Sequence, residues 1–115
     1  MTGPSDRIEA ILKRTRIAYI ADTTAKLEQI HLLFRQWADG CTSADMLIDM
    51  THRHVHGMKG LALTLNYPAI HEACEPVLSI LQHQGPDWTK SDIYTLRSLV
   101  GRLQESADEA FAAGE

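Results

Sequence analysis

Three side chains in a short segment have the chemistry and the spacing to accept a group from another molecule. His52, His56 and Lys59 follow one another at steps of four and three residues, so a helix would place them on one exposed face. An exposed imidazole beside a cation is typical of a nucleophile that accepts a transferred group. Lys59 can then pair with an anion attached to the ring of His56.

Gly60 is informative because glycine is unfavourable inside a helix. It costs about 1 kcal/mol relative to alanine, yet it lies one turn after His56 in an otherwise well-formed helical sequence. We therefore expect another molecule to approach His56 closely. Between residues 50 and 65 there is no Asp or Glu to act as a base, so the pattern indicates a carrier. Whether it counts as an enzyme is left open, and we expect no kinase activity of its own.

The elements that must position these residues are predicted to be helices throughout. Apolar residues recur at alternating steps of three and four, and turn signals fall near residues 38–40, 66–68 and 84–87. Four helical segments with short connections predict an all-α fold, an antiparallel four-helix bundle. Weak helix formers at residues 22–24 leave open a short extra N-terminal helix that ends before Ile17.

Capping residues and the apolar stripes give the helices their expected bounds and buried faces. The first helix is expected from about residue 5 to residue 37. The second begins after Thr42, in a capping box with Asp45, and the fourth begins at Thr89. The predicted core positions are Ile20, Thr23, Leu27, Ile30, Phe34 and Trp37, then Ile48, Thr51, Val55, Met58, Ala62 and Leu65, then Ile70, Cys74, Val77 and Leu81, and finally Ile93, Leu96, Val100, Leu103, Ala107 and Ala110.

Length and composition exclude several classes of protein. The 115 residues fit a single domain, and 44% hydrophobic with 23% charged residues is ordinary globular usage. A net charge of −4 argues against nucleic-acid or anionic-membrane binding driven by charge. The longest apolar run, residues 17–21, is far shorter than the ~20 residues of a membrane span, and no signal peptide is recognised.

The two cysteines indicate the redox environment in which the protein is expected to function. Cys41 and Cys74 fit no metal-ligand spacing and are expected to be free thiols in a reducing environment. We therefore expect a cytoplasmic protein. The initial Met1 and the single-domain length favour a free-standing chain.

The sequence VHGMKG at residues 55–60 resembles the His-x-x-Lys-Gly motif of histidine-containing phosphotransfer (HPt) domains. Members of that family are four-helix bundles of about this length that shuttle a phosphoryl group between aspartates of response-regulator receiver domains. The similarity extends over about residues 47–81. Outside that segment only the helical layout agrees.

The resemblance implies a role for each residue of the motif. His56 would accept the phosphoryl group through Nε2, Lys59 would stabilise it, and Gly60 would keep the approach open. Leu61 stands where the family usually has Ser or Ala, and Asn66 stands where many members have Gly at the helix end. Asn tolerates the left-handed conformation that such a position needs.

Partners and cofactors follow from the same resemblance. The protein would relay signals in a two-component phosphorelay between a hybrid sensor histidine kinase and response regulators. Leu61, Leu63 and His52 would form the surface on which a receiver docks. Mg²⁺ is expected on the receiver and no cofactor on this chain. A single surface histidine at the site and no extra apolar stripe suggest a monomer.

Two other functions remain open. His52 and His56 have the i, i+4 spacing of a two-histidine metal site, with His31 from another helix as a conceivable third ligand. The protein could instead be a helical interaction module that relays nothing. His54 points to another side and is expected to be partly buried, whereas His71 is expected to be an ordinary surface or boundary residue.

Overall fold

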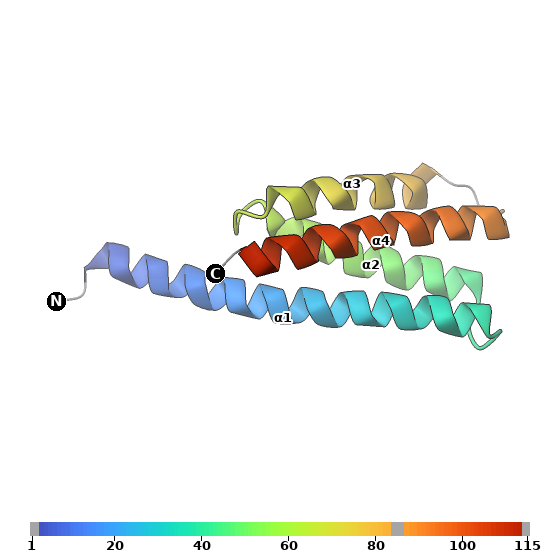
Figure 1. Ribbon diagram of the computed structural model, residues 1–115, viewed down its shortest axis with the longest axis horizontal. Helices are drawn as coiled ribbons and strands as arrows, with labels where there is room; N and C mark the ends of the chain where they lie inside the picture. Colours follow the sequence, from blue (N-terminus) through green and yellow to red (C-terminus); the bar gives the residue numbers. More distant parts are fainter. Residues whose placement is uncertain (1–2, 84–86, 114–115) are drawn as a thin grey trace.

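The computed structural model describes residues 3–83 and 87–113, and these form an antiparallel four-helix bundle (Figure 1). The all-α prediction is confirmed, and the described residues include no strand. Residues 84–86 of the third predicted turn lie outside the described part of the chain. The helices are α1 Pro4–Ala38, α2 Ala44–Ala62, α3 Pro68–His83 and α4 Lys90–Ala113.

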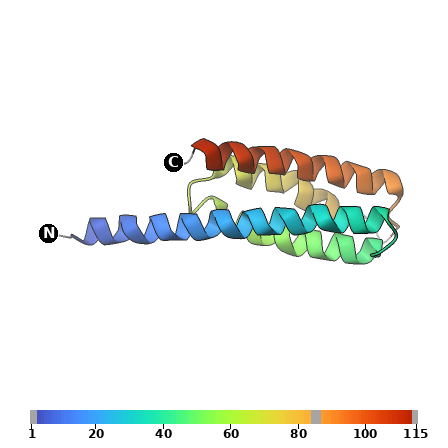
Figure 2. The ribbon, with the colours of Figure 1, turned by 60° about the horizontal axis from the view of Figure 1, so that its bottom comes forward.

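The helices pack in the order of the chain. α1 packs against α2, α2 against α3 and α3 against α4, and a smaller contact between α4 and α1 closes the bundle (Figure 2). The molecule measures 60 × 25 × 20 Å. None of the described helices combines the length and the apolar character that crossing a membrane requires.

The length of the molecule comes from α1, which is a single helix of 35 residues. The short separate helix considered before Ile17 does not form, because α1 runs without a break through residues 22–24. Its start is fixed by Asp6, whose carboxylate accepts a hydrogen bond from the Gly3 N–H at 3.1 Å. The first turns of α1 extend beyond the ends of the other three helices (Figures 1 and 2). The first buried residue of α1 is Tyr19.

Caps set the starts of α2 and α4. The Ser43 hydroxyl accepts from the Met46 N–H at 3.1 Å, so the predicted cap at Thr42 is wrong by one residue. The predicted box at the start of α4 is confirmed. Thr89 N–H donates to the Asp92 carboxylate at 2.8 Å, and Asp92 N–H donates to the Thr89 hydroxyl at 3.1 Å.

The tight connection between α2 and α3 depends on a left-handed residue. Asn66 has φ 66°, in the left-handed region that Asn tolerates better than most residues. Pro68 then starts α3, where its missing N–H is tolerated. This turn sets α2 and α3 side by side, which is the pair of helices that forms the candidate site.

The core follows the predicted stripes with few exceptions. Leu47 is fully buried whereas Ile48 is only half-buried, so the α2 stripe begins one residue earlier than predicted. Ile20, Trp37 and Ala110 are also only partly buried. Tyr19 and Leu33 are buried although the stripe did not include them. The largest fully buried side chains are those of Leu27, Ile30, Leu47, Met58, Leu65, Ile70, Leu96 and Leu103.

Tyr19 links α1 to the helix that carries the motif. Its hydroxyl donates to the Met58 carbonyl oxygen at 2.9 Å. Its ring stacks on Tyr67 with centroids 5.6 Å apart, and Phe111 meets both rings edge-on. Arg16 covers the same end of the bundle, where its Nε donates to the Leu65 carbonyl oxygen at 3.1 Å.

Both cysteines are free thiols, but their surroundings differ. Cys41 is exposed in the connection after α1, whereas Cys74 is completely buried in α3. Burial raises the pKa of the Cys74 thiol to about 12.

Candidate functional site

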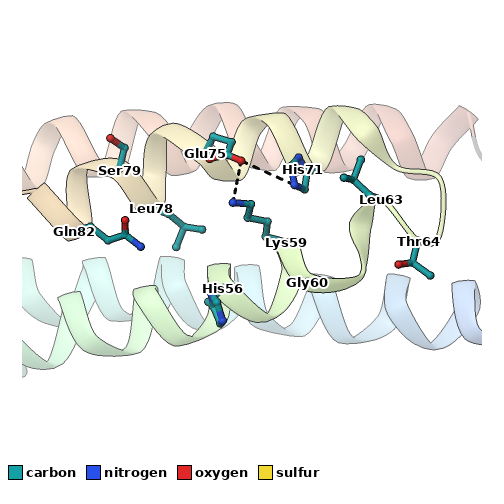
Figure 3. Close-up of a pocket in the computed structure, with 10 residues that line it drawn as sticks. All are labelled: His56, Lys59, Gly60, Leu63, Thr64, His71, Glu75, Leu78, Ser79 and Gln82. Carbon is teal, nitrogen blue, oxygen red and sulfur yellow. Dashed lines mark ion pairs between the residues drawn. The ribbon is translucent and has the colours of Figure 1, made fainter.

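His56 is exposed on α2 and borders an open groove between α2 and α3 (Figure 3). The groove has a volume of about 650 Å³. Lys59 and Gly60 line it on the next turn of α2, so the three residues of the motif lie together. The lining residues are His56, Lys59, Gly60, Leu63 and Thr64 from α2 and the residues after it, and His71, Glu75, Leu78, Ser79 and Gln82 from α3.

The groove arises from the register of two neighbouring helices. His56, Lys59 and Leu63 each follow a buried residue of α2, namely Val55, Met58 and Ala62. The α3 residues of the groove likewise follow a buried position by one, as Glu75 follows Cys74. A step of one residue turns about 100° around a helix, so each set lies on the flank of its helix next to the core. The two flanks face each other along the line where α2 meets α3.

Lys59 crosses the groove to a carboxylate. Its Nζ lies 2.9 Å from Oε1 of Glu75, and Nε2 of His71 lies 4.0 Å from the same oxygen (Figure 3). The hydrogen bond and the charge of Lys59 hold the pKa of the Glu75 carboxyl below its usual value. The cation beside His56 is therefore bound to an anion across the groove.

The side chains on the predicted face of α2 that carries His52 and His56 differ in their exposure to solvent. The face of His52, His56, Lys59 and Leu63 was expected to lie well away from the core, but only His56 and Leu63 are exposed, whereas His52 and Lys59 are half-buried. His52 stacks on His56 with ring centroids 5.9 Å apart and 6° between the ring planes. The difference arises because the face is a flank beside the core and not the outer side of α2.

The three predicted docking residues do not all line the groove. Leu63 lines it and is 58% exposed. Leu61 is 47% exposed but does not line the groove. His52 is also outside it, so of the three predicted docking residues only Leu63 shares the groove with His56.

Two glycines in α2 have different surroundings. A Cβ at Gly60 would meet no described atom within 4 Å, so no packing in the described part of the chain requires glycine there. A Cβ at Gly57 would lie 2.7 Å from the Lys26 ammonium of α1. The Lys26 ammonium is the end of a flexible side chain that can move aside, so a Cβ at Gly57 would displace that ammonium and not the α1 backbone. No described atom near Gly60 explains the cost of a glycine at that position.

Sequence reasoning missed the α3 side of the groove. His71 and Glu75 line it, although His71 was expected to be an ordinary boundary residue and Glu75 was given no role. The signal was the i, i+4 spacing of these two polar residues beside the stripe that contains Cys74. Which helix they would face could not be read from that spacing.

The other histidines do not assemble a metal site among the described residues. No group of three or more His, Cys, Asp or Glu side chains there is placed to hold a metal ion. His31 is hydrogen-bonded to Gln104 of α4 at 2.9 Å, which places it away from the histidines of α2.

His54 is half-buried on the side of α2 that faces α1. Its Nε2 is buried with no hydrogen-bond partner in the described part of the chain. Burial and the charge of Lys26 lower the pKa of His54. The expectation of a partly buried histidine away from the site is therefore confirmed.

Comparison of the chain with protein-family models, with curated proteins and with solved structures gives no significant match. The inference about function therefore rests on the chemistry of the site. It consists of an exposed imidazole, a cation held by a carboxylate across a groove, and an unoccupied surface at Gly60.

Proposed function

We propose that the protein is a histidine phosphotransfer protein that accepts a phosphoryl group on His56 from an aspartyl phosphate of a receiver domain. It then passes the group to another response regulator in a phosphorelay. The observation that carries the proposal is the exposed imidazole of His56 at the edge of a groove whose wall contains Lys59. The four-helix bundle and the open surface at Gly60 are consistent with it.

The transfer is a substitution at phosphorus. A ring nitrogen of neutral His56 attacks the phosphorus of the aspartyl phosphate, so an N–P bond forms while the O–P bond breaks. The aspartate leaves as a carboxylate with the bonding electron pair, and the second ring nitrogen keeps its proton. The reaction needs charge neutralisation and in-line positioning more than covalent help from the acceptor. The receiver supplies Mg²⁺ in this scheme.

Lys59 is the residue of this chain best placed to stabilise the phosphoryl group. It lies one helical turn from His56, and its flexible side chain now ends at Glu75. A phosphoryl group carries close to two negative charges, so it competes strongly with a single carboxylate for the ammonium. We infer that Lys59 exchanges Glu75 for the phosphoryl group when His56 is modified.

The receiver is expected to dock over the groove and the exposed apolar residues beside it. Leu61 and Leu63 are both exposed on the last turn of α2 and just after it. Gly60 lies between them and His56 and adds no side chain to this surface. Such a small apolar patch around a reactive group suits a transient partner. A hybrid sensor histidine kinase would supply the group through its own receiver.

The experiment is to mix the protein with a phosphorylated receiver domain and to weigh the intact chain. We expect one phosphoryl adduct that is labile in acid and stable in alkali, and no adduct on His56→Gln. His52→Gln is the matched control, because His52 stacks on the same ring but is half-buried. It should still accept the group.

The outcomes separate the proposal from its alternatives. No adduct with a panel of phosphorylated receivers would refute the phosphotransfer function and leave an interaction module. An adduct that persists in His56→Gln would show that another residue carries the group. Thermal stabilisation by Zn²⁺ that is lost in both histidine variants would instead favour the metal-site hypothesis.

A further inference from the structure

The first turns of α1 form a helix with no partner among the described helices. Every residue from Pro4 to Arg14 is exposed. Residues 4–14, which we call the projecting segment, span roughly 16 Å at 1.5 Å per residue. They extend beyond α2, α3 and α4 (Figures 1 and 2).

The projecting segment carries an apolar stripe that continues the buried face of α1. Ile8 and Leu12 precede Tyr19 and Thr23 at helical spacing, so they lie on the side of α1 that packs in the bundle. Ile8 is 58% exposed and Leu12 is 41% exposed, and Ile11 beside them is also exposed. The expectation of a monomer assumed that no such extra stripe was present.

A second groove lies where the projecting segment meets the bundle, and we call it the shoulder groove. Its volume is about 500 Å³. Its lining includes the apolar Leu12, Ile20 and Tyr67 and the charged Glu9, Lys13 and Arg16.

The charges along the shoulder groove change sign from one end to the other. Glu9 lies towards the N-terminal end of α1, whereas Lys13 and Arg16 lie towards the bundle. A second copy of the same helix in reverse direction would set its Glu9 opposite the basic pair and its own basic pair opposite the first Glu9. A copy in the same direction would set like charges opposite each other, which is unfavourable.

We propose that two copies of the protein associate through their projecting segments, antiparallel and around a two-fold axis. Ile8 and Leu12 of each copy pack on the same residues of the other, and Ile8 reaches the shoulder groove of its partner. Glu9 of each copy pairs with Lys13 and Arg16 of the other. The interface is isologous, so it closes at the dimer, and it leaves His56 accessible in both copies.

The dimer is expected to be weak. A stable interface buries about 800 Å² on each partner, and a few turns of a single helix offer less than that. We therefore expect an equilibrium between monomer and dimer that shifts on dilution, and not a permanent dimer.

Sedimentation velocity over a dilution series of the full chain tests the proposal. The wild type should be monomeric when dilute and increasingly dimeric as it is concentrated. Leu12→Glu should raise the dissociation constant by at least about tenfold, because it places a carboxylate at the apolar centre of the interface. Met46→Glu is the matched control, since Met46 is 50% exposed at the start of α2, and it should leave the association unchanged.

A charge exchange tests the antiparallel direction. Glu9→Lys should weaken the dimer, because the new lysine faces Lys13 and Arg16 of the other copy. Adding Lys13→Glu in the same chain should restore association, because Lys and Glu then face each other again. In a parallel dimer each of these residues would face its own copy, so both variants would keep like charges opposite each other and neither the loss nor the recovery would appear. Circular dichroism checks that each variant keeps its helix content.

A wild type that stays monomeric at every concentration would overturn the proposal. Association that is unaffected by Leu12→Glu would also overturn it, since another surface would then be responsible. Neither result depends on whether His56 accepts a phosphoryl group.

Discussion

Nζ of Lys59 lies 2.9 Å from Oε1 of Glu75, so the cation beside His56 is bound by the neighbouring helix. In the proposed function this ion pair must open when His56 is modified. Glu75 then opposes phosphorylation in two ways, because it holds Lys59 and because its charge repels the incoming anion. In the proposed function, Lys59 and Glu75 therefore have opposite effects on phosphorylation although they form an ion pair.

Replacing Glu75 with Gln should make His56 a better phosphoryl acceptor. The variant frees Lys59 and removes a negative charge from the groove, so we expect a severalfold higher phosphorylated fraction and a slower loss of the group. Intact mass against time, after the receiver is removed, measures both. Glu72→Gln is the matched control, because Glu72 is exposed on α3 but does not line the groove. An unchanged or shorter lifetime in Glu75→Gln would contradict the exchange of partners.

Replacing Lys59 with Ala should have the opposite effect. Charge-assisted hydrogen bonds contribute about 1.5–3 kcal/mol, so the phosphorylated fraction at equilibrium should fall about tenfold or more. The bundle should stay folded, because the Lys59 side chain is 30% exposed and pairs only at the groove surface. Glu75→Gln should have a smaller effect in the Lys59→Ala background than alone, which a double-variant cycle measures. Equal effects in both backgrounds would mean that Glu75 acts independently of Lys59.

Gly60→Ala should make the protein more stable and a poorer phosphoryl acceptor. A Cβ there meets no described atom, so the gain in helix propensity of up to about 1 kcal/mol is not offset by a clash. The added methyl group instead obstructs the receiver. Gly101→Ala is the matched control, since it also meets no described atom and lies in α4, away from the groove. Urea denaturation and receiver-dependent phosphorylation should separate the two variants. Equal activity in both would show that Gly60 does not serve access.

His54→Gln should reduce the sensitivity of the fold to mild acid. Burial lowers the pKa of His54 from 6.5, so the unfolded chain binds a proton at higher pH than the folded one. Stability is therefore lost as the pH falls from the unfolded value towards the folded one. Denaturation midpoints measured from about pH 8 to about pH 5 should fall less in His54→Gln than in the wild type. The same fall in both would assign the acid sensitivity to other groups.

The sequence was sufficient to predict the four helices, because their apolar stripes and caps are local signals. Where two neighbouring residues offered the same chemistry, the prediction could fail by one position. Ser43 caps α2 in place of Thr42, and Leu47 is buried in place of Ile48. Whether Leu47 or Ile48 is buried depends on how α2 meets the other helices, and that information lies outside the local pattern.

The candidate site was predicted on one side only. The spacing on α2 identified His56, Lys59 and Gly60, and all three share the groove. The groove also needs Glu75, and its contact with Lys59 joins residues of different helices. Periodicity gives the face of a helix on which a residue lies, but not the neighbour that this face meets. The projecting segment was missed for the same reason. Its apolar stripe has the spacing of a core stripe, and the sequence does not show that α2, α3 and α4 end before they could cover it.

The buried thiol of Cys74, next to Glu75, can report how often α2 and α3 separate. Cys74 lies in the core where α2 meets α3, and a thiol with a pKa of about 12 does not react with an alkylating reagent while it stays enclosed. Cys41 is exposed and would be modified at once. In a Cys41→Ser background, the rate of Cys74 alkylation therefore measures how often the two helices that bear His56 and Glu75 separate. Any partner that clamps these helices together should slow that reaction, and this makes docking visible without a phosphoryl group.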